Sequence, residues 1–530
     1  MKKTLSVLIA AAIVFALMSA IPFAGSAAWD GEASAAFTGS GSSSDPYIIA
    51  SAENLKYLQL KVADGEDYEG KYFTQTADID LGGKEWTPIG TSGLYFSGIY
   101  DGLGHSVTGL SITRTDINAI GLFGYIQSGY KHETGIMNLK VFGDIVIKGL
   151  TVDAGMGGVV GWVYKDSTDG FMTPKLINVE NHVNFDIDAA GKQPRFGAVA
   201  GYIFTAEITG VKNYGSIVYT GSGHTRIGGI VGQTNRSVFR YCENNGDITV
   251  NATGAASAQA AGISGMTTWK VSGVYSEFDH CVNNGKITCS AESGACFAGG
   301  ILAAIYTPGS VFESKVHDCI NNGAISAKVT DQNVTDKNAY AAGIIPRLAL
   351  SSVEITNNVN ASLEITSEGV TGDFAAGIVS DITKNEPDTI VVKDNISITG
   401  NIIAKTVFEV AGAGGTPAAT DAALADAKAK ITSGFPASYS DLKIDGFPGK
   451  AEETTAPVTT DGVTTAEVTE VTSDEPEVTT AEVTTAGADV TTAAPQTEPA
   501  PAGGCKSAIG AGIGIAAAIG LAALAVRKKD

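Results

Sequence analysis

Three cysteines with the same neighbours are the residues of this chain that most readily suggest chemistry. Cys242, Cys281 and Cys319 each open the phrase Cys-x-Asn-Asn-Gly, at intervals of 39 and 38 residues. Repeated thiols of this kind can bind a metal, form disulfides or pack as small buried side chains. His280 and His317 are close in sequence to two of the cysteines, and histidine and cysteine together are common metal ligands.

The spacing of the histidines argues against a metal centre. His280 precedes its cysteine by one residue and His317 precedes its cysteine by two, so strand alternation would turn the two rings to opposite faces. We therefore expect no metal and no cofactor here. A disulfide between stacked cysteines stays open, although such pairs often lack the required torsion. A ladder of buried free thiols is the preferred interpretation.

Other residues raise the question of an enzyme. Asp78 and Asp80 face the same side of a presumed strand, and a polysaccharide lyase or hydrolase would need such carboxylates to converge on one groove. Asp101 precedes a glycine and indicates a tight turn. His132-Glu133 lacks the second histidine that an HExxH zinc site requires. We predict no catalytic residue, although a site assembled from distant coils stays possible.

The cysteine phrase belongs to a longer repeat. Gly-Gly-Ile-Val-Gly or a close variant begins at eight positions, 31 to 43 residues apart: Ile120, Gly157, Gly197, Gly228, Ala261, Gly299, Ala342 and Ala376. A variable period in this range is typical of a solenoid whose insertions lie in loops. Each phrase is too short for a helix and is rich in β-branched residues, so it predicts a short strand bounded by glycine.

Three such strands per unit, stacked at about 4.8 Å, make a parallel β-helix. The predicted fold is all-β: a right-handed parallel β-helix solenoid with short capping helices, a disordered Thr-rich stalk and one C-terminal transmembrane helix. Asn and Gly suit a left-handed corner between strands, and stacked Asn side chains can form a hydrogen-bonded ladder. The predicted structural turn residues are Asn245, Gly246, Asn284, Gly285, Asn322 and Gly323.

Helices are expected at both ends of the solenoid, because an open coil exposes strand edges. Ser51 is a candidate N-cap, and Leu55, Leu58 and Val62 follow at helical spacing. This helix should close the first coil. Thr416-Pro417 opens an Ala-rich helix that should cover the last coil or begin the stalk.

The two ends of the chain predict export and anchoring. Residues 1–27 carry two lysines, an apolar run and small residues, as a secretory signal peptide does. Ser507 to Val526 is uncharged and, at roughly 20 residues, long enough to cross a bilayer. Three basic residues follow, so the positive-inside rule places the remainder of the chain outside the cell.

The predicted domains between those ends follow from composition. They are an N-terminal segment with a capping helix (28–69), the β-helix (70–410), a C-terminal helix or cap (411–450) and a Thr/Pro/Glu-rich stalk (451–504), before the anchor (505–530). The stalk segment has too few apolar residues to offset its ordering entropy. The formal net charge of -21 argues against nucleic acid as a partner.

The repeats also carry a family resemblance. GGIVGQTNRSVFRYCENNGDITV resembles the GLUG repeat of bacterial surface proteins, and similar units extend from about residue 120 to 403. The stretch from DPYIIASAENLKYL through YEGKYFTQTADIDLGGKEWTPIG is similar to secreted clostridial β-helix proteins. The resemblance implies a surface β-helix in which ADIDLGG is a structural turn. It implies no particular activity.

We therefore expect a noncatalytic cell-surface protein of a Gram-positive bacterium that binds a glycan or a host or cell-surface protein. A surface-tethered polysaccharide lyase or glycoside hydrolase and a structural surface-layer component are the alternatives. Two repeats are six residues longer between their phrases, and their insertions carry Trp269, Tyr275 and Tyr306. These rings are the predicted ligand-binding residues. Alternatively, they fold back and cover the sheet.

Overall fold

The structure is a computed structural model that describes residues 29–436, with gaps at 34–35, 269–275, 307–313, 335–336, 350–351, 363, 371, 384–389, 398–400, 404–405 and 409–420. The predicted signal peptide, stalk and membrane anchor lie outside the described residues. Neither helix within the described part is long and apolar enough to cross a membrane.

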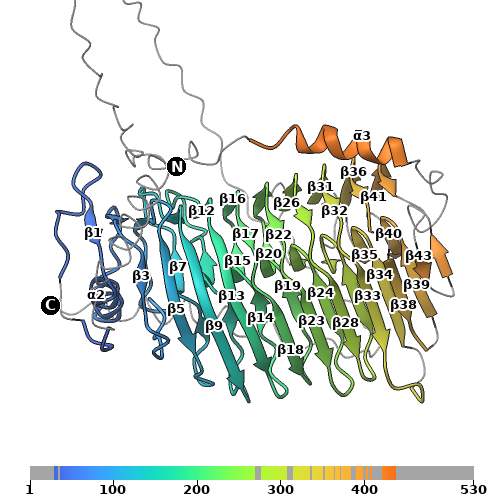
Figure 1. Ribbon diagram of the computed structural model, residues 1–530, viewed down its shortest axis with the longest axis horizontal. Coiled ribbons are helices and arrows are strands. Elements are labelled where there is room, and N and C mark those ends of the chain that lie inside the picture. The colour runs from blue at the N-terminus through green and yellow to red at the C-terminus, as the bar shows by residue number, and fades with distance from the viewer. Residues whose placement is uncertain are drawn as a thin grey trace, which may run out of the picture. The chain divides into compact units, whose positions relative to one another are not determined.

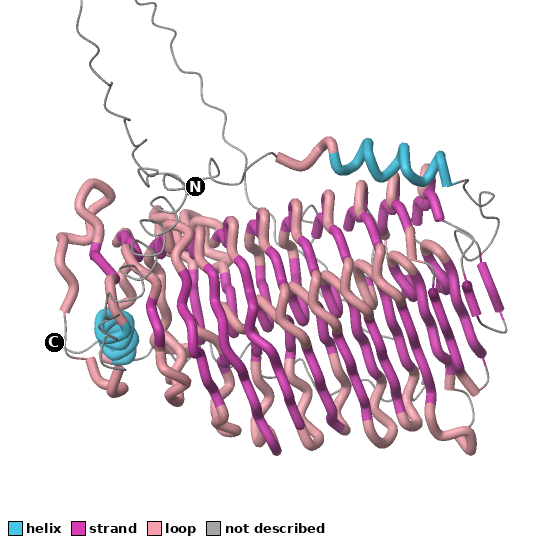
Figure 2. The backbone as a smooth tube through the Cα atoms, viewed as in Figure 1, coloured by secondary structure: helices cyan, strands magenta, loops and turns pink. Residues whose placement is uncertain are grey.

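The described residues form a solenoid of stacked coils in which every pairing between named strands is parallel (Figures 1 and 2). Successive coils contribute one strand each to the same sheets, so the strand order runs along the stack. The parallel β-helix solenoid is confirmed.

Four sheets run along the stack. We call them sheets 1 to 4, in the order in which one coil passes through them. Sheet 1 contains β1 (Tyr47–Ile49), β2 (Tyr72–Gln75), β4 (Ile99–Asp101), β8 (Gly135–Met137), β12 (Lys175–Ile177), β16 (Glu207–Thr209), β21 (Val238–Arg240), β26 (Ser276–Asp279), β31 (Ser314–His317), β36 (Val353–Thr356) and β41 (Ile390–Lys393).

Sheet 2 contains β3 (Ile79–Asp80), β5 (Ser106–Ile112), β9 (Lys140–Lys148), β13 (Glu180–Asp188), β17 (Lys212–Asn213), β18 (Ile217–Gly221), β22 (Glu243–Asn244), β23 (Ile248–Ala252), β27 (Val282–Asn283), β28 (Ile287–Ala291), β32 (Ile320–Asn321), β33 (Ile325–Val329), β37 (Val359–Asn360), β38 (Glu364–Glu368), β42 (Ile396–Ser397) and β43 (Asn401–Ile403).

Sheet 3 contains β6 (Ala119–Ile120), β10 (Gly155–Met156), β14 (Arg195–Gly197), β19 (Arg226–Gly228), β24 (Ala258–Ala261), β29 (Cys296–Gly299), β34 (Asn338–Ala342), β39 (Gly372–Ala376) and β44 (Thr406–Phe408). Sheet 4 contains β7 (Phe123–Gln127), β11 (Val160–Tyr164), β15 (Ala200–Phe204), β20 (Val231–Asn235), β25 (Ser264–Thr268), β30 (Ile305–Tyr306), β35 (Ile345–Ala349) and β40 (Val379–Thr383).

The prediction of three strands per coil is wrong, because two of the predicted strands bend. Each glycine phrase divides into a strand of sheet 3 and a strand of sheet 4, as Gly228 ends β19 and Val231 begins β20. The strand expected to end at the cysteine phrase divides likewise, because the residue before the cysteine has a left-handed backbone. The solenoid also begins before residue 70, since β1 pairs with β2.

The left-handed corner lies before the cysteine position and not at the Asn-Gly pair. Tyr241, His280 and Asp318 have φ values of 56°, 52° and 54°, and each precedes its cysteine. Gly285 is required for another reason. A Cβ at this residue would lie 2.1 Å from the carbonyl oxygen of Gly246 on the preceding coil, so close stacking of the turns excludes a side chain.

Two asparagine ladders run along this turn. The buried Asn283 side chain donates from Nδ2 to Asn321 Oδ1 at 2.8 Å, and the same bond recurs from Asn181 as far as Asn360. The exposed Asn284 donates to Asn245 Oδ1 at 2.8 Å, and Asn322 donates to Asn284. The stacked amides therefore satisfy one another from coil to coil.

The cysteines form a column in the core. Cys242, Cys281 and Cys319 are fully buried and carry free thiols. The same position is occupied by Val211 on the coil before them and by Asn358 on the coil after them. The thiols are directed at carbonyl oxygens, for example from Cys319 to Phe278 O at 3.5 Å. Small size and weak hydrogen bonding suit cysteine to this place.

Helix α2 (Ala52–Ala63) begins as predicted. The Ser51 side chain accepts a hydrogen bond from the Asn54 backbone N–H, and Leu55, Leu58 and Val62 are buried in the core. Figure 1 shows α2 beside the first strands of the stack. The amphipathic spacing therefore places its apolar face at the beginning of the solenoid.

Helix α3 (Asp421–Thr432) lies along the side of the solenoid (Figure 1). The prediction that it covers the last coil is therefore wrong, and the alternative that it begins the stalk stays a prediction. Ile431 packs on Val282, Ile320 and Val359, which follow the cysteine position on three successive coils. On earlier coils that position holds charged residues such as Glu243. This row therefore changes from charged to apolar residues where α3 covers it.

Gly285→Ala should lower the free energy of unfolding by about 3 kcal/mol or more, because the added Cβ overlaps a backbone oxygen that cannot move without separating two coils. Cys281→Ala should cost only about 1–2 kcal/mol, for a small cavity. Gly93→Ala is the matched control, since nothing lies within 4 Å of a Cβ there. Thermal and denaturant unfolding of the full chain measure all three, and equal losses for both alanine-for-glycine variants would contradict the stacking argument.

Candidate functional site

Of the three predicted ligand-binding aromatic residues, the structure describes Tyr306 alone. Trp269 and Tyr275 lie outside the described residues. Tyr306 is 42% exposed at the end of β30. Phe278, which follows Trp269 and Tyr275 in the first insertion, is fully buried and stacks on Phe239, with 4.9 Å between the ring centroids. In the chain, both insertions follow a strand of sheet 4, since β30 pairs with β25.

Sheet 4 carries a column of aromatic side chains on its outer face. Tyr125, Trp162 and Tyr202 occupy equivalent positions on three successive coils. Their ring centroids are 6.2 Å apart for Tyr125 and Trp162 and 5.0 Å apart for Trp162 and Tyr202. Successive side chains of a strand point to opposite faces of the sheet. Val163, which follows Trp162, is buried in the core, so the three rings point outwards. All three rings are partly exposed.

A second aromatic pair lies in the adjacent outward column. Tyr164 and Phe204 stack at 5.1 Å with an interplanar angle of 21°. The register of sheet 4 continues this column to Tyr306. We call Tyr125, Trp162, Tyr164, Tyr202 and Phe204 the aromatic face. The predicted residue Tyr306 thus lies on the same outer surface, several coils further along.

The sequence contained a signal for this face that our reasoning missed. The glycine phrases end in Gly124, Gly161 and Gly201, and the next residues are Tyr125, Trp162 and Tyr202. The predicted ligand-binding residues lie instead where the repeat units differ in length. Equivalent positions next to the glycine phrase would have shown the column once the units were aligned.

Guanidinium groups lie over these rings. The Arg195 guanidinium is 5.4 Å from the Trp162 ring centroid and 5.2 Å from that of Tyr202, and Arg236 is 4.8 Å from that of Phe204. Such contacts are attractive because the ring face is electron-rich. Burial raises the pKa of Tyr202 to about 12, against the opposing charge of Arg195. The face therefore combines flat apolar surfaces with fixed positive charge.

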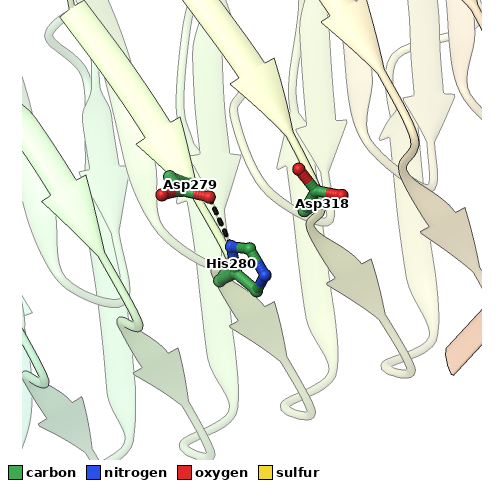
Figure 3. A group of neighbouring side chains, drawn as sticks. All are labelled: Asp279, His280 and Asp318. Carbon is green, nitrogen blue, oxygen red and sulfur yellow. Dashed lines mark hydrogen bonds and ion pairs between the residues drawn. The ribbon is translucent and has the colours of Figure 1, made fainter. Parts of the chain in front are cut away.

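A second candidate site is a group of histidine and carboxylate side chains near β26 and β31. Asp279, His280 and Asp318 each place one possible ligand atom within 4.8 Å of the others (Figure 3). These residues could hold a metal ion. His280 and His317 both contact Asp279, so the expectation that the two rings point to opposite faces is wrong. The left-handed backbone of His280 breaks the strand alternation.

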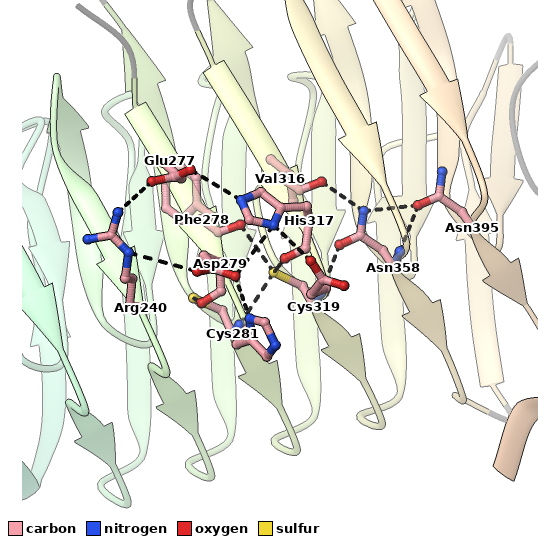
Figure 4. A network of polar contacts seen from close by, with 12 residues as sticks. Arg240, Glu277, Phe278, Asp279, Cys281, Val316, His317, Cys319, Asn358 and Asn395 are labelled. Atoms are coloured by element: carbon pink, nitrogen blue, oxygen red, sulfur yellow. Dashed lines mark hydrogen bonds and ion pairs between the residues drawn. The ribbon is translucent and has the colours of Figure 1, made fainter. Parts of the chain in front are cut away.

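These residues belong to a wider ion-pair network (Figure 4). Arg240 lies 2.8 Å from Glu277 and 3.8 Å from Asp279. His317 uses Nε2 toward Glu277 at 3.3 Å and Nδ1 toward Asp318 at 2.9 Å. We call these residues, with His280, the ion-pair cluster. Three carboxylates thus surround one guanidinium and two imidazoles, which favours the protonated histidines.

The pKa shifts agree with this arrangement. The hydrogen bond that the His280 ring donates to the Asp279 carboxylate raises the pKa of His280 despite burial. Burial opposes protonation of His317, but its contacts with Asp318, Asp279 and Glu277 outweigh that effect and raise its pKa. Burial also disfavours ionised Asp279, yet the two histidines and Arg240 lower its pKa. As it stands, the cluster is an internally paired structural network.

The remaining acidic candidates have structural roles. Asp78 accepts hydrogen bonds from the Ser106 backbone N–H and hydroxyl, which lower its pKa. Asp80 accepts from the Gly82 backbone N–H. The buried Asp101 accepts from the Leu103 N–H and the Asn138 amide, as expected for a turn aspartate. Glu133 pairs with Lys175 at 3.1 Å.

Comparisons with known proteins show limited similarity. No family model matches the chain. A stretch of 115 residues is 37% identical to a protein named "Putative Gly-rich membrane protein" of Evansella cellulosilytica, which covers 20% of this chain and 12% of that protein. A stretch of 183 residues is 34% identical to halomucin of Haloquadratum walsbyi, which covers 27% of this chain and 2% of halomucin. The chain therefore spans a small part of either relative.

Among solved structures, a putative immunoglobulin A1 protease from Bacteroides ovatus aligns with 71% of this chain and 86% of its own, at 17% identity and a TM-score of 0.29. None of these similarities assigns the chain to a family. The resemblance to GLUG repeats stays a prediction.

The ion-pair cluster predicts a pH dependence of stability. The raised pKa values of His280 and His317 mean that their contribution is fully present below the unfolded value of about 6.5 and is lost as pH rises through the folded values. The lowered pKa of Asp279 means that its contribution is lost on strong acidification. The melting temperature should fall as the pH rises above about 6.5. His317→Gln should flatten this fall, whereas replacing the exposed His224 by Gln should leave it unchanged; a profile that His317→Gln does not alter would refute this role.

Proposed function

We propose that this chain is a noncatalytic bacterial cell-surface protein whose β-helix presents the aromatic face to a glycan. The observation that carries the proposal is the run of partly exposed rings at equivalent positions on successive coils of sheet 4. Aromatic side chains offer a large, rigid contact area at low entropic cost, and sugar rings have flat apolar faces that pack on them. A protein partner at this face is the alternative ligand.

The described carboxylates give less support to a polysaccharide lyase or hydrolase. Such an enzyme needs carboxylates, or a base beside cations, that converge on the substrate. In the described part of the chain, the closest group of carboxylates and histidines is the ion-pair cluster, where each member already has a charged partner. Asp78, Asp80 and Asp101 fix turns. Binding without chemistry is therefore the better proposal.

The proposed surface location follows from the sequence. A signal peptide at residues 1–27, a polar stalk and an apolar segment from Ser507 to Val526 followed by basic residues form the usual order of an exported, membrane-anchored protein. One relative, similar over a short stretch, is named a membrane protein, which agrees with this location. A β-helix held outside the cell by a stalk would present its faces to external polymers. The GLUG resemblance points the same way.

Deleting Ser507 to Asp530 should move the protein from the membrane fraction into the culture medium, because the truncated chain no longer carries a stop-transfer segment. Immunoblotting of cell fractions measures this. A deletion of the same length within the stalk, Val471 to Ala494, should leave the protein in the membrane fraction. Retention of the truncated protein on cells after a high-salt wash would contradict the anchor assignment.

Trp162→Ala and Tyr202→Ala should each weaken glycan binding roughly tenfold, equivalent to about 1.4 kcal/mol, since each removes one stacking ring. A glycan array followed by titration of the best ligand measures the loss. Tyr214→Ala is the control, because Tyr214 is an exposed ring, 42% accessible, in the turn between β17 and β18. If binding survives both changes at unaltered melting temperature, the aromatic face is not the binding surface. An assay for released products on the same glycans tests the enzyme alternative.

A further inference from the structure

Side chains on the outer faces of sheets 3 and 4 form one row along each sheet, and the two rows contact each other along the solenoid. Arg195 of sheet 3 donates from Nε to Gln233 Oε1 of sheet 4 at 3.1 Å. On the next coil the Arg226 Nε atom lies 3.2 Å from Met266 Sδ. Gly155 precedes Arg195 in the same row of sheet 3, and a Cβ there would lie 2.5 Å from Trp162 Nε1. We call this meeting of two outward rows the 3–4 corner.

Two like charges are stacked in this corner. Arg195 and Arg226 are direct Cα partners on the neighbouring strands β14 and β19. Like charges directly opposite each other destabilise a sheet. The Arg226 pKa is lowered by burial and by the charge of Arg195, and Asp153 only partly opposes this. Asp153 Oδ1 itself accepts a hydrogen bond from the Gln193 N–H at 2.9 Å.

Among the described residues, no carboxylate lies within ion-pair distance of Arg195 or Arg226. The ion pairs of arginines in the described part of the chain involve Arg114, Arg240 and Arg347, and none involves Arg195, Arg226 or Arg236. The chain has 56 acidic residues against 35 lysines and arginines, so acidic partners are abundant elsewhere. In the part of the chain that the structure describes, these two adjacent guanidinium groups thus lack a carboxylate partner although acidic residues outnumber basic ones.

The other end of the same corner provides an internal comparison. There Arg347 of sheet 4 lies 5.6 Å from the ring centroids of Phe297 and Tyr340 of sheet 3. The arginine is thus on sheet 4 and the rings are on sheet 3, the reverse of the arrangement at Arg195. However, Arg347 pairs with Asp381, its partner on the next strand, at 3.3 Å. Arginine–aromatic packing in this fold is thus compatible with a neutralising carboxylate. The pair at Arg195 and Arg226 lacks one.

We propose that the 3–4 corner binds an acidic sugar unit, with Arg195 and Arg226 pairing with its carboxylate while Trp162 and Tyr202 pack against its ring. This deepens the proposed glycan binding and depends on it. A carboxylate matches the planar guanidinium fork and forms charge-assisted hydrogen bonds with it. The ligand would supply the missing counter-ion and relieve the repulsion between the two arginines. The rings beside them give the site selectivity for a sugar over a free anion.

The charge of the chain indicates what kind of acidic glycan fits. A net charge of -21 repels a long polyanion, and the few guanidinium groups at the aromatic face neutralise only a few negative charges. A sparsely charged glycan, with isolated uronic acid units among neutral sugars, meets both constraints. Single-stranded nucleic acid, which also stacks on aromatic rings, carries one charge per nucleotide and is disfavoured.

The test compares one polysaccharide in two forms. The full chain is titrated with a polymer that carries one glucuronate per repeating unit and with the same polymer after reduction of its carboxyl groups. We expect at least tenfold tighter binding of the acidic form. Arg195→Gln and Arg226→Gln should each remove most of this difference, and Arg226→Gln should leave the melting temperature unchanged or raised. Arg114→Gln is the control, since Arg114 is paired with Asp116.

The outcomes separate the two proposals. Equal binding of both forms, sensitive to Trp162→Ala, would overturn the acidic-sugar inference and retain glycan binding. If no glycan, neutral or acidic, binds the chain, both proposals are overturned. Tighter binding of single-stranded DNA than of the acidic polymer would overturn the sugar assignment. A lowered melting temperature for Arg226→Gln with unchanged discrimination would show that the arginine is structural.

Discussion

Parallel hydrogen bonding between successive coils is the interaction on which the rest of this structure depends. It fixes equivalent residues of neighbouring repeats at one strand spacing, about 4.8 Å. Every side chain type that recurs in the sequence therefore becomes a column in space. Buried columns must be satisfied internally, as the Asn283 ladder and the cysteine column are. Outward columns are free to differ, and they determine what the surface can bind.

The same constraint explains what the sequence predicted. Repeat period, glycine phrases and the Cys-x-Asn-Asn-Gly turn indicated a β-helix because stacking demands identical small residues where the backbones are closest. The Ser51 cap of α2 was also predictable, since capping is local. The position of α3 was not. Its docking depends on Val282, Ile320 and Val359, which become one apolar stripe only after stacking.

The candidate site was harder to predict for a related reason. Trp162 and Arg195 lie on different sheets and adjacent coils, 33 residues apart in the chain, so no local motif contains both. Strand alternation correctly separates inward from outward residues, but it fails at left-handed positions. His280 is such a position, and the expected separation of the two histidines failed there. Contacts across corners require the register of every sheet.

The column of Tyr125, Trp162 and Tyr202 has one ring per coil. The number of rings that one polymer can contact therefore depends on the number of repeats. Each additional coil extends every outward column by one residue while repeating the same core, as in other repeat proteins. A polymer lying along the stack meets several rings at once, and each engaged ring raises the effective concentration of the next sugar at its neighbour. Gain or loss of one coil would therefore change avidity for long chains in a step, without altering the chemistry of any single contact.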